Sequence, residues 1–146
     1  MTIKLLVVPL FFIASTADAQ QAHPSGFPIG SLFTLVSIDG QPVTERPPTM
    51  TITLARNGNP MAAGFGGCRG WFGQMGGLEH GKIKFEIVAT TAPIAGREPC
   101  GPDHQATEQK FIATLESAAR WQLDADTLIV QGDGSAGALR MTNKGR

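Results

Sequence analysis

The stretch KIKFEIVA at residues 82–89 decides the fold class of this 146-residue chain. Apolar residues occupy its odd-numbered positions from Ile83 to Ile87, and charged residues occupy its even-numbered positions from Lys82 to Glu86. A period of two is typical of a β-strand that buries one face and exposes the other. We therefore predict a strand over residues 82–89, in a sheet that has one face on a hydrophobic core.

Three further strands are predicted upstream. Residues 31–39 are apolar and β-branched and end in an Asp-Gly turn pair. Residues 50–55 alternate between large apolar residues and Thr or Ala, and an Asn-Gly hairpin signal follows them. The return strand of this hairpin is expected over residues 61–65.

One helix is predicted downstream. Pro102 is typical of a helix start, and it follows an irregular connection over residues 90–101. Phe111 and Leu115 lie four residues apart, and the apolar stripe that they begin ends at Ala119, where we expect the helix to end. The solvent-exposed face of this helix is expected to carry three charged residues: Glu108, Lys110 and Glu116.

Short strands over residues 121–123, 127–131 and 138–142 complete the pattern, separated by Asp-rich and Gly-rich turns. Strands followed by one helix and then by more strands are typical of an α+β domain. We predict an α+β fold in which a curved, largely antiparallel, half-barrel-like sheet packs on one α-helix. The length fits one such domain, which we place at residues 31–142.

A glycine-rich stretch, GFGGCRGWFGQMGG at residues 64–77, precedes the central strand. So many glycines predict a bulged or looped segment. Aromatic side chains in a loop can be exposed and then mark a partner surface. The candidate partner contacts are Arg69, Trp71, Phe72 and Met75. The alternative is that the apolar ones close the end of the sheet.

Cys68 and Cys100 are the two cysteines of the chain. In an oxidising compartment an even pair is most simply a disulfide, and this is our prediction. The alternatives are a nucleophilic thiol or a metal ligand. Zinc sites use closely spaced ligand pairs, which the sequence does not contain.

The N-terminus predicts export. Residues 1–19 combine one Lys, a short apolar run and a small-residue ending, as a signal peptide cleaved after Ala19 would. The apolar run is too short to span a bilayer, and no cysteine is available there for a lipid anchor. We expect a flexible lead-in without core residues at 20–30, a tail at 143–146, and no membrane span in the mature chain, which is periplasmic or secreted.

Charge and motifs argue against several function classes. Twelve Lys and Arg balance twelve Asp and Glu, so the basic surface of a nucleic-acid binder is missing. A partial phosphate-loop pattern ending at Lys82 fails because Ile83 stands where Ser or Thr would bind Mg²⁺. The three histidines are not at ligand spacing. We therefore expect no catalytic residues, no metal, no cofactor and no enzymatic activity.

Short motifs spread over residues 31–142 are similar to those of the META domain family of HslJ-like proteins. Arg69 and Trp71 stand where that family has Asn and Tyr. The order and spacing of the motifs carry the resemblance: Val36-x-Ile38-x-Gly40-x-Pro42-Val43, Pro48-Thr49-x-Thr51-Ile52, Gly66-Gly67-Cys68, Ala89-Thr90-Thr91, Cys100, Glu108-x-x-Phe111-Ile112-x-x-Leu115, Leu128 and Leu139.

The resemblance implies a compact bacterial envelope domain, associated with stress, secretion or motility, with no enzymatic activity. We expect a monomer that binds an unknown protein or envelope component, or supports the envelope under stress. Two alternatives stay open. One is a secreted hydrolase inhibitor that uses the loop around Trp71, and the other is a carrier that holds a small apolar ligand on the concave face of the sheet.

Overall fold

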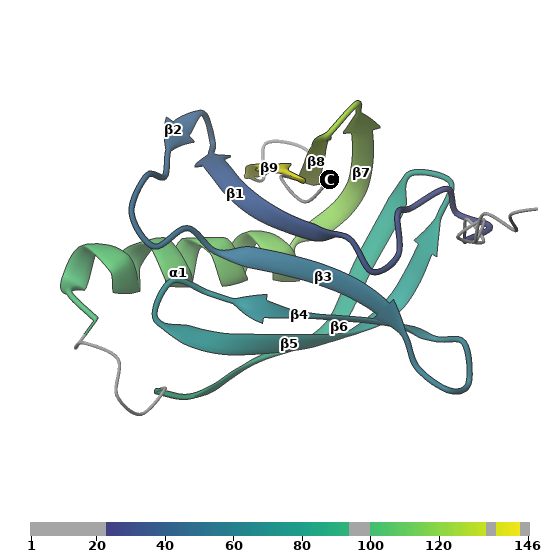
Figure 1. Ribbon diagram of the computed structural model, residues 1–146, viewed down its shortest axis with the longest axis horizontal. Coiled ribbons are helices and arrows are strands. Elements are labelled where there is room, and N and C mark those ends of the chain that lie inside the picture. Colours follow the sequence, from purple (N-terminus) through teal and green to yellow (C-terminus); the bar gives the residue numbers. More distant parts are fainter. Residues whose placement is uncertain (1–22, 94–99, 134–136, 144–146) are drawn as a thin grey trace, which may run out of the picture.

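The computed structural model describes residues 23–93, 100–133 and 137–143 (Figure 1). The predicted signal peptide at 1–19 and the last residues of the predicted tail lie outside this range. The described residues form nine strands and one helix: β1 (Leu32–Ile38), β2 (Gln41–Pro42), β3 (Thr49–Leu54), β4 (Pro60–Phe65), β5 (Arg69–Glu79), β6 (Lys82–Pro93), α1 (Pro102–Glu116), β7 (Ala118–Asp124), β8 (Thr127–Gly132) and β9 (Ala138–Thr142).

Eight of these strands form one closed antiparallel barrel. Neighbours follow the order β1, β3, β4, β5, β6, β7, β8 and β9, and β9 returns to pair with β1 between Thr34↔Thr142 and Ile38↔Leu139. The two-residue strand β2 pairs with β1 outside this ring. The predicted α+β class, with a curved antiparallel sheet and one helix, is confirmed. The closure by β1 and β9 completes what the sequence predicted as a half-barrel.

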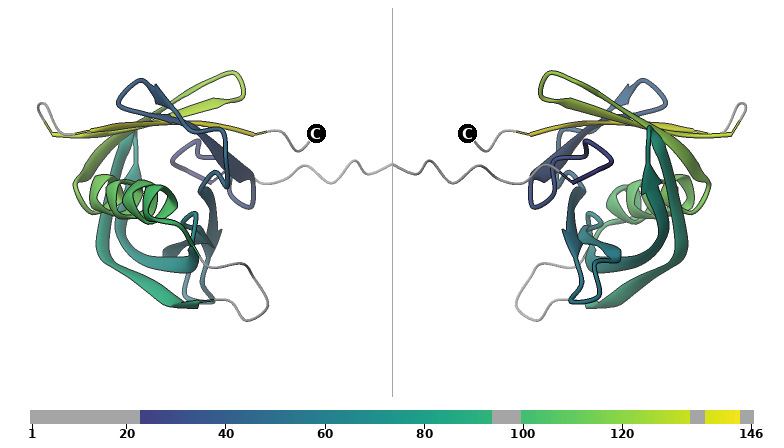
Figure 2. Two further views of the ribbon diagram at one scale, coloured as in Figure 1. Left: turned by 90° about the vertical axis from the view of Figure 1, so that its left-hand side faces the viewer. Right: turned by 90° about the vertical axis from the view of Figure 1, so that its right-hand side faces the viewer.

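The barrel is least regular between β6 and β7. These strands pair at a single position among the described residues, Lys82↔Arg120. Figure 2 shows α1 lying beside β6, with β7 to β9 on its other side. Phe111 and Leu115 of α1 are fully buried, so the helix contributes its apolar stripe to the barrel core.

The helix ends three residues earlier than predicted. Its last residue is Glu116, and the backbone N–H of Ser117 closes the final turn by donating to the Ala113 carbonyl. Ala118 is buried as predicted, but it lies in β7, where it pairs with Gly132. The buried alanine therefore belongs to the strand pattern that follows the helix, and β7 begins before the predicted Trp121.

The glycine-rich stretch is a strand. Residues 69–79 form β5, and the register with β6 shifts at three places, so the predicted bulges are present. The prediction of a loop is wrong for these residues, because β5 pairs with β6 along its length and with β4 from Gly70 to Gln74. β6 is also longer than predicted and runs to Pro93, into the segment expected to be irregular.

The lead-in contributes to the core, contrary to expectation. Phe27 is 1% exposed, and its ring centroid lies 5.9 Å from that of Phe33 and 5.0 Å from that of Trp121. The backbone N–H of Gly30 donates to the Ile52 carbonyl and fixes the chain against β3. A single aromatic residue in a Pro-rich and Gly-rich stretch shows no period, and its burial is therefore a tertiary effect.

Candidate functional site

Glu108 joins α1 to the start of β5. Its Oε2 accepts hydrogen bonds from the backbone N–H groups of Cys68 (3.0 Å) and Arg69 (2.8 Å), and its Oε1 accepts from the Arg69 Nε (2.8 Å). The Arg69 Nη2 also lies 2.8 Å from Oε1. The Glu108 side chain is 2% exposed, so a buried carboxylate with every lone-pair direction used holds the helix to the sheet.

The prediction that Glu108 lies on the solvent-exposed face of the helix is therefore wrong. Glu108 precedes Phe111 by three residues and Leu115 by seven, which places it on the same stripe as the core residues. That spacing is the one sequence signal that could have found it. A charged residue at a core position of a helix needs a partner, and Arg69 is that partner.

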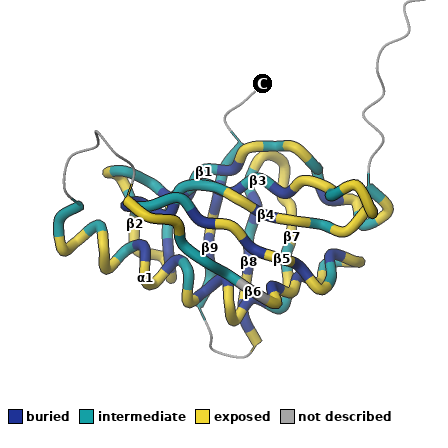
Figure 3. The backbone as a smooth tube through the Cα atoms, turned by 90° about the horizontal axis from the view of Figure 1, so that it is seen from below, coloured by how far each residue is buried: buried dark blue, intermediate teal, exposed yellow. Residues whose placement is uncertain are grey.

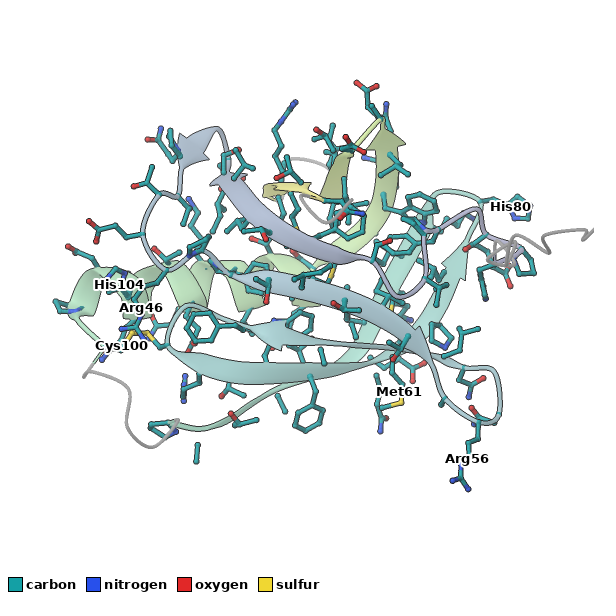
Figure 4. The ribbon with its side chains drawn as sticks, in the orientation of Figure 1. Arg46, Arg56, Met61, His80, Cys100 and His104 are labelled. Carbon is teal, nitrogen blue, oxygen red and sulfur yellow. A yellow bond between two sulfur atoms is a disulfide. The ribbon has the colours of Figure 1, made fainter. Side chains whose placement is uncertain are left out.

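A disulfide lies beside this carboxylate. Cys68 and Cys100 are bonded, with their Cα atoms 5.5 Å apart, and this agrees with the predicted pairing. The bond links the β4–β5 connection to the segment just before α1 (Cys100 is labelled in Figure 4). The disulfide and the Glu108 hydrogen bonds thus fix the same two pieces of chain, and we call this group the junction (Gly66, Cys68, Arg69, Cys100 and Glu108).

Gly66 is required at the junction. A Cβ built there would lie 2.6 Å from the Glu108 Oε2, closer than a side chain can approach. The next residue, Gly67, has a φ of +112°, in the region that favours glycine. The two glycines therefore allow the backbone N–H groups of Cys68 and Arg69 to reach the Glu108 Oε2.

Trp71 and Met75 are core residues, which leaves neither side chain free to form a partner surface. Trp71 is 2% exposed and Met75 is 7% exposed. The indole N–H of Trp71 donates to the Thr49 carbonyl at 2.9 Å, and its ring packs edge-on against Phe111. For these two residues the structure agrees with the alternative, in which they fill the barrel. Strand alternation decides this, because Trp71 and Met75 point inward and the residues beside them point outward.

Phe72 points outward and is 44% exposed. It lies in a row of Cα partners that crosses four strands, Thr51↔Ala63↔Phe72↔Ala89, and the neighbouring row contains Thr53↔Met61↔Gln74. These seven residues carry no charge, and we call them the outer patch. Figure 4 shows Met61 projecting from the sheet, and Figure 3 shows exposed residues along β4 and β5.

Charged residues stand around the outer patch. The Arg46 guanidinium lies 5.9 Å from the centre of the Phe65 ring, at the end of β4. At the other side, Glu86 lies over the backbone of Gly76, where a Cβ would meet the carboxylate. An uncharged centre with a charged rim is the arrangement found in protein–protein interfaces.

A second surface feature is an open groove between α1 and β6, with a volume of about 330 Å³. We call it the α1–β6 groove. Arg69, half exposed, and Glu108 lie at one end, and Glu116 lies eight residues further along the helix. The walls carry Val88 and Thr90 from β6 and Gln109, Ile112 and Ala113 from α1.

Asp39 locks the closing strands of the barrel. Its Oδ1 accepts from the Ala138 backbone N–H at 2.7 Å, and its own N–H donates to the Ala138 carbonyl at 2.9 Å. Its Oδ2 lies 3.1 Å from the Lys110 ammonium on α1. The hydrogen bond from Ala138 and, after it, the contact with Lys110 hold the pKa of Asp39 below its ordinary value. The sequence marked Asp39 only as a turn residue.

Metal ligands do not gather in the described part of the chain, where no group of three His, Cys, Asp or Glu side chains could hold an ion. Within residues 23–93, 100–133 and 137–143, no helix has both the length and the apolar character that a membrane crossing requires.

The META domain matches residues 29–144, which is most of the chain. The chain belongs to the META domain family. The match contains the junction, the outer patch and the α1–β6 groove, and it begins two residues before the predicted boundary at 31, within the lead-in that the structure ties to β3. No curated protein sequence matches the chain at a significant level.

Two solved structures share this META fold. The NMR structure of a protein from Burkholderia xenovorans is 19% identical, with a TM-score of 0.60, and the match covers 95% of this chain and 100% of that one. A second NMR structure is 21% identical, with a TM-score of 0.56, and the match covers 78% of this chain and 89% of that one. At these identities the likeness establishes the fold alone.

Proposed function

We propose that this META domain binds another protein through the outer patch, outside the cytoplasm and without catalysing a reaction. The observation that carries the proposal is the pair of uncharged rows that crosses β3 to β6 around the exposed Phe72. Exposed apolar residues that are contiguous and rimmed by charge are typical of a partner surface. The complementary partner presents an uncharged, apolar face of its own.

The outer patch is rigid, and this favours recognition. Phe72, Ala63 and Thr51 are held in register by two antiparallel pairings. Their neighbours in the sequence, Trp71, Ala62 and Ile52, are buried in the core. A patch that is fixed before contact loses little conformational entropy on binding.

The absence of catalysis is part of the proposal. The two cysteines are consumed by the disulfide, and the buried carboxylate of Glu108 has its oxygens occupied by four donors. A nucleophile or general base needs a free lone pair directed at a substrate. Neither the two cysteines nor the Glu108 carboxylate therefore offers a nucleophile or a general base.

The location outside the cytoplasm rests on the disulfide together with the predicted signal peptide. A disulfide forms and persists in an oxidising compartment such as the periplasm or the exterior. A role in envelope stress is the part of the proposal that rests on the family resemblance alone.

The two alternatives fit the structure less well. The inhibitor hypothesis requires a protruding loop around Trp71, and this segment is a paired inner strand of the barrel. The carrier hypothesis requires space inside the sheet, and the interior is filled by core side chains that include Phe33, Trp71 and Phe111.

Site-specific photocrosslinking in the native envelope tests the proposal. A photoreactive phenylalanine analogue at position 72 is expected to yield one discrete protein adduct, and the same analogue at the exposed Leu123 of β7 is expected to yield none. Unlabelled wild-type protein should compete for the adduct, and the Phe72→Asp variant should not. Equal competition by wild type and Phe72→Asp, or the same adduct from position 123, would contradict the proposal.

A further inference from the structure

The edge of β6 that faces away from β5 is unpaired over most of its length. β7 pairs with β6 only at Lys82↔Arg120 among the described residues, whereas β6 continues to Pro93 with β5 on one side alone. In an antiparallel strand, alternate residues direct their N–H and C=O groups to each side. β6 therefore presents a row of backbone donors and acceptors on the side where α1 lies, and a strand edge of this kind is a template for another extended chain.

The α1–β6 groove lies along this edge. Val88 and Thr90 form its β6 wall, and Ile112 and Ala113 belong to its helical wall. Glu108 and Glu116 are eight residues apart on α1, which corresponds to about 12 Å along a helix. An extended peptide covers about 12 Å with four residues, so the length of the groove fits a short strand.

Charge distinguishes the two ends of the groove. At one end the Arg69 guanidinium is neutralised by Glu108 at 2.8 Å. At the other end Glu116 is exposed and forms no ion pair within the described residues. The net negative charge of the groove therefore lies at its Glu116 end, and a basic side chain complements it.

We propose that the α1–β6 groove binds an extended peptide segment of about four residues, which adds to the free edge of β6 and places a basic side chain at Glu116. The occupant alternates apolar and polar side chains, because the groove has an apolar wall and an open side. The backbone hydrogen bonds supply affinity, and the side-chain positions supply specificity, as in other cases of strand addition. This site is separate from the outer patch, and neither proposal depends on the other.

The direction of the peptide follows from the sheet. β6 runs from the Glu116 end of the groove toward the Arg69 end, since Arg69 pairs with Pro93 at the end of β6. A strand added antiparallel, as every pairing in this barrel is, has its C-terminal residue at Glu116. The probe is therefore a capped pentapeptide, acetyl-Val-Thr-Val-Thr-Lys-amide.

Titration of the isotopically labelled, oxidised protein with this probe, followed by backbone amide chemical shifts, tests the proposal. We expect saturable shifts confined to the β6 residues from Phe85 to Thr91 and to the α1 residues that face them. Backbone N-methylation of the probe at alternate residues should reduce the affinity at least tenfold, because it removes the donors that pair with β6. Replacement of the probe's Lys by Glu should also weaken binding.

Protein variants locate the site. Ala113 is exposed on α1, so Ala113→Trp is expected to fill the groove without loss of folding and to reduce probe affinity at least tenfold. Leu123→Trp, on the distant β7 strand, should leave the affinity unchanged. Glu116→Gln should abolish the preference for Lys over Glu in the probe, and Glu79→Gln, an exposed acid outside the groove, should preserve it.

Any one of three results would overturn the proposal. They are no saturable shift with the probe at about 5 mM, equal binding of the N-methylated peptide, and unchanged affinity in Ala113→Trp. The outer patch is tested independently, because Phe72→Asp should leave probe binding intact. A protein adduct from position 72 that wild type but not Phe72→Asp competes away, together with no peptide binding at the groove, would support the first proposal and reject this one.

Discussion

The Glu108 carboxylate on α1 accepts hydrogen bonds from both the backbone N–H and the guanidinium of Arg69, each at 2.8 Å. This pair and the adjacent disulfide Cys68–Cys100 connect the same helix and the same strand start. The helix that packs against β6, β8 and β9 is thus held by a covalent bond and by a charge-assisted network.

Glu108→Gln is expected to lower the free energy of unfolding by about 2–3 kcal/mol, because the amide nitrogen would face hydrogen-bond donors and leave Arg69 without its counter-charge. Urea unfolding of the oxidised protein measures this. Glu116→Gln, on the exposed side of the same helix, serves as the control and should change stability by less than about 0.5 kcal/mol. Equal effects of the two substitutions would show that the junction does not stabilise the fold.

Removing the disulfide by the double substitution Cys68→Ser and Cys100→Ser should cost about 3–4 kcal/mol, the chain-entropy value for a loop of this length. Denaturant unfolding of wild type with and without a dithiol reductant should give the same difference. Wild-type protein unfolded without reductant should contain no titratable thiol. Two thiols per chain would refute the disulfide.

Trp71→Ala is expected to lower stability by about 3–5 kcal/mol, because it empties a buried aromatic site and leaves the Thr49 carbonyl without its donor. Phe72→Ala, at the neighbouring exposed position, should lower it by less than about 1 kcal/mol. Thermal and urea unfolding of the two variants compare the inward and outward faces of β5 directly. A larger loss in Phe72→Ala would reverse the assignment of these faces.

Gly64→Ala should destabilise the protein by about 3 kcal/mol, because a Cβ at residue 64 would lie 2.0 Å from the Thr49 carbonyl oxygen. This carbonyl is the acceptor for Trp71, which pairs with Gly64 across the strands. Gly77→Ala is the matched control, since no atom lies within 4 Å of a Cβ there. If both substitutions had the same effect, the close approach of Thr49 to Gly64 would not be limiting.

Asp39 is expected to make stability depend on acidity. Its pKa in the folded state lies below the ordinary value of 3.8, so its stabilising contribution is present above that value and is lost as the pH falls through the folded pKa. The stability difference between wild type and Asp39→Asn should therefore be largest at neutral pH and should shrink below about pH 4. Asn is suited to the positive φ of 49° at this position.

Urea unfolding of both proteins between neutral pH and pH 2 measures this difference. Lys110→Gln should reduce the pH dependence only in part, because the hydrogen bond from Ala138 is the larger cause of the lowered pKa. A difference that stays constant across the range would contradict the assignment.

Local patterns in the sequence determined the strands and the helix. The alternation over residues 82–89, the Asn57-Gly58 hairpin and the Phe111–Leu115 spacing each reflect contacts within one element, so that β6, the β3–β4 hairpin and α1 were predictable. The pairing of Cys68 with Cys100 was predictable as well, because the chain offers each cysteine one partner. The glycines predicted the bulges of β5 but concealed the strand.

Tertiary structure alone decided the burial of Phe27, Trp71 and Glu108 and the exposure of Phe72. Trp71 and Phe72 are adjacent in the sequence, and only the pairing of β5 with β4 and β6 determines which one enters the barrel. Glu108 can be buried because Arg69, 39 residues away, comes within hydrogen-bond distance when the barrel closes. A strand or helix is specified by neighbours along the chain, whereas a site depends on which distant residues the folded barrel brings together.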